Sequence, residues 1–191
     1  MKGNGGRIFL GFRDLKENTH MGKQSTRENK TIYQLCREEQ GLTREKASEK
    51  MEGVSASRIE KIEYELQEPT PYDVIQMADC YKRPELCNYY CSHKCVIGDR
   101  YVPEIEVSEL PDIILETIAS LNEINPLTSR LIQIARDGKI TDDEIHDFAL
   151  ISKRLDEVSL AIDSLNLWVD KMVSENNINI ELLKEERAKL G

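Results

Sequence analysis

The chain has 191 residues, of which 39% are hydrophobic and 32% charged, and its formal net charge is −9. This length is sufficient for one large domain or two small ones with a buried core. No apolar run approaches the roughly 18 residues of a membrane span, and the short run RIFLGF near the N-terminus lacks the length and the cleavage site of a secretory signal. The composition therefore predicts a cytoplasmic protein.

The charge is distributed unevenly along the chain. Residues 1–24 hold five basic residues against two acids, residues 25–101 hold twelve against fourteen, and residues 102–191 hold nine against nineteen. An acidic half repels phosphates, so any contact with nucleic acid must come from a local basic patch in the first half. Residues 1–24 have no sustained periodicity and three glycines in their first six positions, and they are predicted to be a disordered basic arm.

Residues 25–96 read as five short helices without a strand signal. Gly41 and Gly53 are expected to end the first two helices, and Pro84 to begin the fifth. At the starts of the other four helices, the sequence has side chains that can accept hydrogen bonds from backbone N–H groups of the first turn. The predicted N-caps are Thr31, Thr43, Ser55 and Thr70.

The second and third of these helices carry the most informative pattern. Residues 42–63, LTREKASEKMEGVSASRIEKIE, place two helices around a tight glycine turn, with the small Ala47 and Ser48 where a crossing helix needs close approach. Followed by EPTPYDVIQMADCY, this pattern resembles the XRE (Cro-like) helix-turn-helix family of DNA-binding regulators. The resemblance covers residues 30–83. It implies a five-helix domain whose third helix enters the major groove.

The resemblance also implies which residues contact DNA. Ala56, Ser57 and Lys61 fall where the family reads bases, and Arg44 falls where the family meets the sugar–phosphate backbone. Tyr64, just past the recognition helix, can donate its hydroxyl to a phosphate. The full set of candidate DNA-binding residues is Arg44, Ser55, Ala56, Ser57, Arg58, Lys61 and Tyr64.

Two features depart from the usual pattern of the family. The turn containing Glu52 and Gly53 is one residue longer, and several glutamates surround the recognition helix. Those glutamates would repel phosphates if they faced DNA. The alternative interpretation is therefore a scaffold or partner-binding protein that uses the helix-turn-helix and a long helix as protein interaction surfaces. The glutamates are Glu60, Glu63, Glu65 and Glu68.

Four cysteines lie along the predicted fifth helix and on either side of it. In a reducing compartment they favour metal binding, redox sensing or packing over structural disulfides. Zinc or an iron–sulfur cluster is possible, but the CxxxCxxxC spacing differs from the usual CxxC and also suits a buried helix face, so packing is the favoured interpretation and no cofactor is favoured. Reversible oxidation of a cysteine pair is a weaker option. The cysteines are Cys80, Cys87, Cys91 and Cys95, and His93 between them is expected at the surface.

The C-terminal half is predicted to be a helical association domain, residues 107–191, after an extended linker at 97–106. A helix over 110–124 and a short helix ending at Gly138 precede a long helix that begins at Thr141, with Thr141 and Glu144 as its capping box. The long helix carries apolar residues at alternating spacings of three and four, a pattern typical of a coiled coil. We expect a homodimer through Phe148, Ile151, Leu155, Val158, Ile162, Leu165, Trp168 and Val169.

An alternative to the dimer is that the tail, residues 177–190, folds back over the same strip within one chain. No phosphate loop, nucleophile motif or histidine pairing indicates an enzyme. The sequence thus predicts an all-α fold, with a five-helix Cro-like domain at 25–96 followed by a helical hairpin or coiled-coil domain with one long helix. It favours a sequence-specific DNA-binding transcriptional regulator that binds double-stranded DNA.

Overall fold

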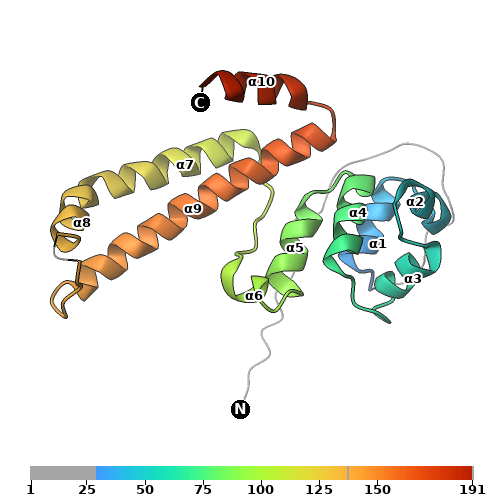
Figure 1. The fold of residues 1–191 in the computed structure, drawn as a ribbon, viewed down its shortest axis with the longest axis horizontal. Coiled ribbons are helices and arrows are strands. Elements are labelled where there is room, and N and C mark those ends of the chain that lie inside the picture. Colours follow the sequence, from blue (N-terminus) through green and yellow to red (C-terminus); the bar gives the residue numbers. More distant parts are fainter. Residues whose placement is uncertain (1–28, 137, 191) are drawn as a thin grey trace, which may run out of the picture.

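The computed structural model describes residues 29–136 and 138–190, and the predicted basic arm at 1–24 lies outside them. Within these ranges every regular element is a helix, which confirms the all-α prediction. The helices form a small bundle near the N-terminus and an elongated C-terminal hairpin, joined by a short connecting segment (Figure 1). None of the described helices is both long and apolar enough to cross a membrane.

The bundle holds five helices between residues 29 and 96. They begin where the sequence predicts, because each of the four expected cap side chains accepts a hydrogen bond from a backbone N–H in the following turn. At Thr70 the cap is reciprocal, since the carboxylate of Asp73 also accepts from the Thr70 N–H at 2.7 Å. The helices are α1 (Ile32–Glu39), α2 (Arg44–Lys50), α3 (Ala56–Glu63), α4 (Pro71–Tyr81) and α5 (Glu85–His93).

One apolar core unites the bundle. All five helices contribute to it, and the largest of its fully buried apolar side chains come from α3, α4 and α5. Two further core residues, Met51 and Val54, lie in the connection between α2 and α3. This packing places α3 at the edge of the bundle with one face inward. The buried core residues are Tyr33, Cys36, Ala47, Met51, Val54, Ile59, Ile62, Val74, Met77, Ala78, Tyr81 and Leu86.

The segment predicted as an extended linker, 97–106, is only partly extended. Residues Gly98–Tyr101 form a one-turn helix, α6, that packs on α5. Gly98 is buried so close to the backbone of α5 that a Cβ there would collide with the carbonyl oxygen of Cys91. The glycine therefore permits helix packing here instead of marking a flexible linker. Beyond α6, the side chain of Asn88 bonds Pro103 O and Ile105 N, which holds the chain against α5.

The C-terminal half is built on two antiparallel helices, α7 (Leu110–Ile124) and α9 (Ile145–Ser174), which lie side by side (Figure 1). A 3-10 turn, η1 (Asn125–Leu127), and α8 (Thr128–Ile134) connect them. The tail forms α10 (Ile180–Leu190).

Two boundaries near the hairpin tip differ from the prediction. The long helix begins at Ile145, and Glu144 is its N-cap residue. The Glu144 carboxylate accepts from both the N–H and the hydroxyl of Thr141, so these two residues form a turn before the helix and not the predicted capping box. The preceding helix ends at Ile134, earlier than the predicted stop at Gly138, whose φ of +70° suits glycine in the turn.

Candidate nucleic-acid interface

Helix α3 has one face in the core and one face in solvent. Ile59 and Ile62 are buried, whereas Ser55, Ser57 and Lys61 are exposed on the outer side. Ser55 precedes the helix and its hydroxyl oxygen accepts the Arg58 N–H at 3.2 Å. Small polar groups and one lysine thus line the accessible start of this helix, and Ala56 lies half-buried beside them. Such a surface can approach the edges of base pairs closely.

The turn before α3 is held in place from both sides. Gly53 adopts a φ of +71°, and the Ser48 hydroxyl donates to the carbonyl of Val54 at 2.8 Å. Val54 is buried, and the Glu52 N–H donates to the Gln76 side chain at 2.7 Å. The extra residue of this turn is therefore accommodated within an ordered connection that fixes α3 against α2.

Arg58 points back into the domain. Its guanidinium donates from Nη2 to the carboxylate of Asp73 at 2.7 Å and to the carbonyl oxygen of Glu68 at 2.9 Å. Burial by itself would raise the pKa of Asp73, but hydrogen bonds from Arg58 and Thr70 outweigh it and hold the pKa below its ordinary value. Arg58 thus ties α3 to the start of α4, a structural task that its position in the sequence does not reveal.

Arg44, at the first turn of α2, is also engaged. Its Nε donates to Glu63 at 2.8 Å, its Nη1 lies 3.4 Å from Glu60, and its guanidinium stacks over the Tyr64 ring at 4.8 Å. Burial would lower the pKa of Arg44, but hydrogen bonds with Tyr64 and Glu63 raise it, so the cation is retained. The side chain keeps part of its surface in solvent, next to Tyr64.

Glu63 is the centre of a buried ion network. Its side chain is 0% exposed, and it accepts from Arg37 in α1 at 2.5 and 2.9 Å as well as from Arg44. This carboxylate is therefore turned away from any nucleic acid and neutralised by two guanidinium groups. Two of the other three glutamates near α3 also have partners, since Glu60 faces Arg44 and Glu68 faces Lys94. Internal pairing weakens the repulsion that the sequence alone predicts.

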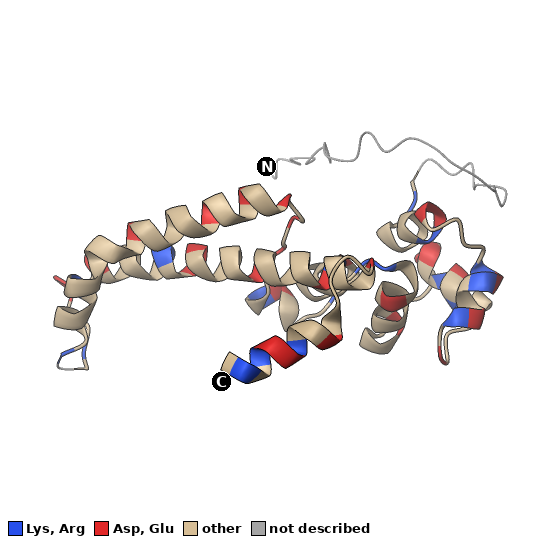
Figure 2. Cartoon of the chain, turned by 90° about the horizontal axis from the view of Figure 1, so that it is seen from above, with Lys and Arg blue, Asp and Glu red and all other residues tan. Residues whose placement is uncertain are grey.

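Three exposed lysines outside these networks lie on α2 and α3. Lys46, Lys50 and Lys61 are exposed, and none of them forms an ion pair within the part of the chain that the structure describes. Lys46 and Lys50 are four residues apart and therefore share one side of α2. This spacing is visible in the sequence, but the resemblance to the family did not mark these two lysines as candidates. Acidic residues are interspersed with them in both helices (Figure 2).

Comparison with known proteins agrees with this geometry. Residues 34–85 match a family model described as Helix-turn-helix (HTH_3). These residues form a helix-turn-helix domain of the XRE type. The helix-turn-helix match supports a DNA-binding regulator in general, from a family whose members are generally not enzymes. No curated protein and no solved structure matched the chain.

The four clustered cysteines lie in helices α4 and α5 and just after α5. Cys80 and Cys87 pack against the apolar core, and burial raises the pKa of both thiols, which disfavours the thiolate that binds metals. Cys95 lies past the end of α5 and accepts from the Gly98 N–H at 3.4 Å. Among the described residues, no three histidine, cysteine or acidic side chains converge in a way that would hold a metal ion.

His93 ends α5 at the surface, as predicted. Its ring stacks on Tyr89 with centroids 4.6 Å apart, and its Nε2 lies 3.5 Å from Glu104. Tyr89 in turn packs edge-on against Tyr33 at 6.1 Å. These contacts give the histidine a role in joining α5 to the segment after α6.

Proposed function

We propose that the protein is a sequence-specific transcriptional regulator that binds double-stranded DNA as a dimer in the cytoplasm. The observation that carries this proposal is the helix-turn-helix match over residues 34–85, together with the exposure of Ser55, Ser57 and Lys61 on the outer side of α3. In this arrangement α3 enters the major groove and the start of α2 lies along the phosphate backbone.

We assign most of the candidate residues to two groups. Ser55, Ala56, Ser57 and Lys61 are proposed to meet base edges, because they lie on the accessible side of α3. The candidate phosphate contacts are Arg44 and Tyr64, which stack on each other, with Lys46 and Lys50 added from α2. Arg58, bonded to Asp73, is proposed to orient α3 without reading a base.

The charge of this surface bears on affinity. Basic and acidic residues alternate over α2 and α3 (Figure 2), so non-specific attraction to the phosphates is weak. Groove contacts by a few side chains must then supply most of the discrimination between sequences. The same mixed charge favours the second candidate, a helix-turn-helix that binds a protein partner.

A duplex selected from a random pool tests the proposal. Lys61→Glu is compared with Lys153→Glu, which makes the same change of charge at an exposed position of α9. If α3 enters the groove, Lys61→Glu lowers affinity for the selected duplex by about 10-fold or more, corresponding to a lost contact worth about 1–3 kcal/mol. Lys153→Glu leaves the affinity within about 2-fold.

Titrations at several salt concentrations separate specific from non-specific binding. The wild type should prefer the selected duplex over a scrambled one by about 1000-fold or more. Equal binding of the two duplexes, or equal loss in both variants, would contradict sequence-specific binding through α3. Failure to enrich any duplex would favour the partner-binding alternative.

A further inference from the structure

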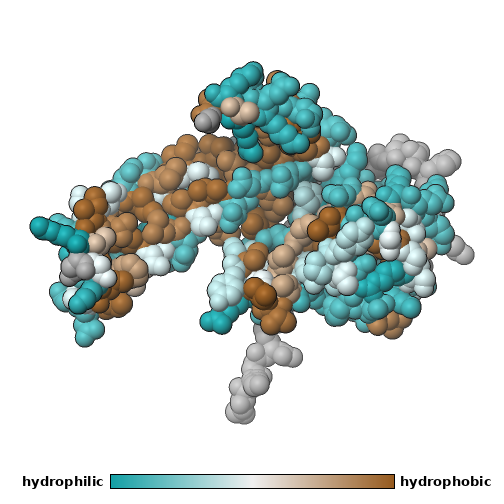
Figure 3. All heavy atoms as spheres, viewed as in Figure 1, coloured by the Kyte–Doolittle hydropathy of each residue, from teal (hydrophilic) through white to brown (hydrophobic). Residues whose placement is uncertain are grey.

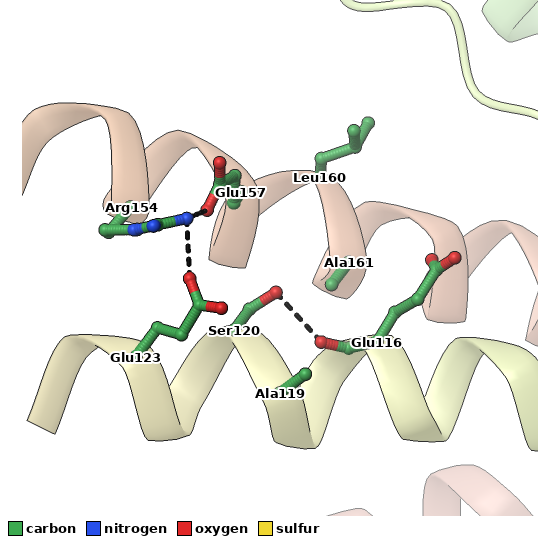
Figure 4. Close-up of a pocket in the computed structure, with 8 residues that line it drawn as sticks. All are labelled: Glu116, Ala119, Ser120, Glu123, Arg154, Glu157, Leu160 and Ala161. Carbon is green, nitrogen blue, oxygen red and sulfur yellow. Dashed lines mark hydrogen bonds and ion pairs between the residues drawn. The ribbon is translucent and has the colours of Figure 1, made fainter.

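The α7–α9 hairpin has two unlike faces. On one face, Arg154 of α9 forms ion pairs with Glu123 of α7 at 2.5 Å and with Glu157 at 2.7 Å (Figure 4). Glu116 lines the same shallow pocket. Charged side chains from both helices therefore meet on this face and satisfy one another in solvent.

The opposite face is apolar. Ile113 and Ile151 are buried along the line where the helices meet, and Glu116 and Glu123 lie to one side of that line on α7. Residues three or four apart share a helix side, so an apolar row follows the other side of α7. The corresponding side of α9, away from Arg154, carries a second row. The exposed residues are Ile114, Ile118 and Leu121 of α7 and Leu155 and Ile162 of α9.

The two apolar rows of this face lie in a half of the chain that is strongly acidic. The three acids of α7 are spaced by four and seven residues, so they share the charged side. In α9 the positions beside the apolar row hold Ser152, Ser159 and Asn166. Figure 3 shows hydrophobic surface continuing along both helices. A contiguous apolar patch of this kind is uncommon on a protein that works alone.

The tail leaves the apolar rows of this face exposed within the chain. Helix α10 has no buried residue, and its Leu182 is 54% exposed. In Figure 1, α10 turns back from the C-terminal end of α9 and runs obliquely above the start of α7. Residues 177–190 turn back from the end of α9, as the intramolecular alternative expects, but Leu155 and Ile162 of the strip stay exposed.

We propose that the apolar face of the hairpin binds the same face of a second copy, so that α7 and α9 of two chains form a four-helix bundle. This inference rests on the dimer of the proposed function and adds the docking surface, including a contribution from α7. A two-fold axis brings identical patches together, which is the commonest arrangement of homodimers. The dimer would also hold two α3 helices, one for each half-site of a paired DNA sequence.

Size and charge both favour a second copy. With a rise of about 1.5 Å per residue and a width of about 10 Å per helix, α7 and α9 present roughly 700 Å² per chain, which approaches the roughly 800 Å² per partner of a stable interface. Two acidic halves repel each other unless their acids lie outside the contact. The placement of the α7 acids on the far side meets that condition.

The face differs from the seam that heptad spacing alone predicts. Ile151 is 1% exposed inside the hairpin, so it packs within the chain. Leu165 and Trp168, which the sequence placed in the exposed strip, are half-buried, as are Phe148, Val158 and Val169. Of the predicted seam, Leu155 and Ile162 stay exposed enough to contact a second chain, together with the apolar row of α7.

A matched pair of substitutions two residues apart tests the proposal. Ile162, 45% exposed, lies on the apolar face, and Leu160, 41% exposed, lies beside the charged pocket. Light scattering and sedimentation of the full chain at micromolar concentration should show a dimer for the wild type and for Leu160→Glu. Ile162→Glu should weaken dimerisation by about 100-fold or more, because it buries an unpaired carboxylate. Ile118→Glu should do the same from α7.

Several outcomes would overturn the proposal. These are a monomeric wild type, an Ile162→Glu protein as dimeric as the wild type, an Ile118→Glu protein that stays dimeric, or equal losses in Leu160→Glu and Ile162→Glu. Circular dichroism checks that each variant keeps its helices, and Ile162→Gln replaces any glutamate variant that unfolds. Because no DNA enters this measurement, a dimer that binds no DNA contradicts only the regulator, and a DNA-binding monomer contradicts only the dimer.

Discussion

The helix-turn-helix bundle and the C-terminal hairpin use their apolar residues in opposite ways. The bundle gathers side chains from five helices into one core, and its central residues, such as Ile59 and Met77, are fully buried. In the 30-residue α9, by contrast, only Ile151, Ala161 and Leu167 are buried. The bundle therefore carries its own stability, whereas the hairpin keeps apolar surface for another chain.

The two regions also place their charges differently. In the bundle, Glu63 is buried between the guanidinium groups of Arg37 and Arg44, and it joins α1, α2 and α3. In the hairpin, Arg154 pairs with Glu123 at a surface where both side chains reach solvent. A buried charge depends on its partners for compensation, but an exposed one is compensated by water. Removal of a charged side chain should therefore lower the free energy of unfolding far more in the bundle than in the hairpin.

Replacement of Glu63 by alanine should have the largest effect. It leaves Arg37 and Arg44 without their shared carboxylate, and removal of one member of a buried pair typically costs about 3–5 kcal/mol. Urea denaturation followed by circular dichroism measures the loss. Glu60→Ala serves as the control because Glu60 pairs with Arg44 at an exposed position, where we expect at most about 1 kcal/mol. Similar losses in the two variants would remove the distinction between the regions.

Two isoleucine truncations compare the apolar residues directly. Ile59→Ala creates a cavity in the bundle core and should destabilise the protein by about 2–4 kcal/mol. Ile162→Ala, studied in an Ile118→Glu background to keep the chain monomeric, should change stability by at most about 0.5 kcal/mol. Thermal unfolding of both variants gives the comparison. A large loss for Ile162→Ala in the monomer would show that the hairpin packs this residue internally.

The smallest expected effect concerns pH. The pKa of Asp73 is below its ordinary 3.8. The Asp73 carboxylate therefore binds a proton less readily in the folded bundle than in the unfolded chain. Its contribution is present above about pH 4 and is lost as the pH falls through the lower, folded pKa. Asp73→Asn should cost about 0.5–2 kcal/mol at neutral pH, as for other caps, and should flatten the acid limb of the stability profile. Asp79→Asn, on the exposed side of α4, is the control and should leave that limb unchanged.

Local chemistry was readable from the sequence. A cap such as Thr43 or Ser55 bonds a backbone group three residues away, so the helix starts follow from the chain alone. The same holds for the period of α9 and for the helix-turn-helix pattern, which the family match at 34–85 confirms. Such signals involve neighbours in sequence, and the folded context does not have to be known.

Long-range partners were not readable. The guanidinium of Arg58 bonds Asp73, 15 positions away, and Glu63 bonds Arg37, 26 positions away, so neither side chain has the role that its place near the recognition helix implies. Periodicity likewise marked an apolar stripe on α9 without showing which edge of it α7 covers. Sequence by itself determined the helices and their faces, because those depend on local hydrogen bonds and on helical repeat. Only the tertiary structure decided which charges are compensated and which apolar residues stay exposed, because both depend on packing between distant segments.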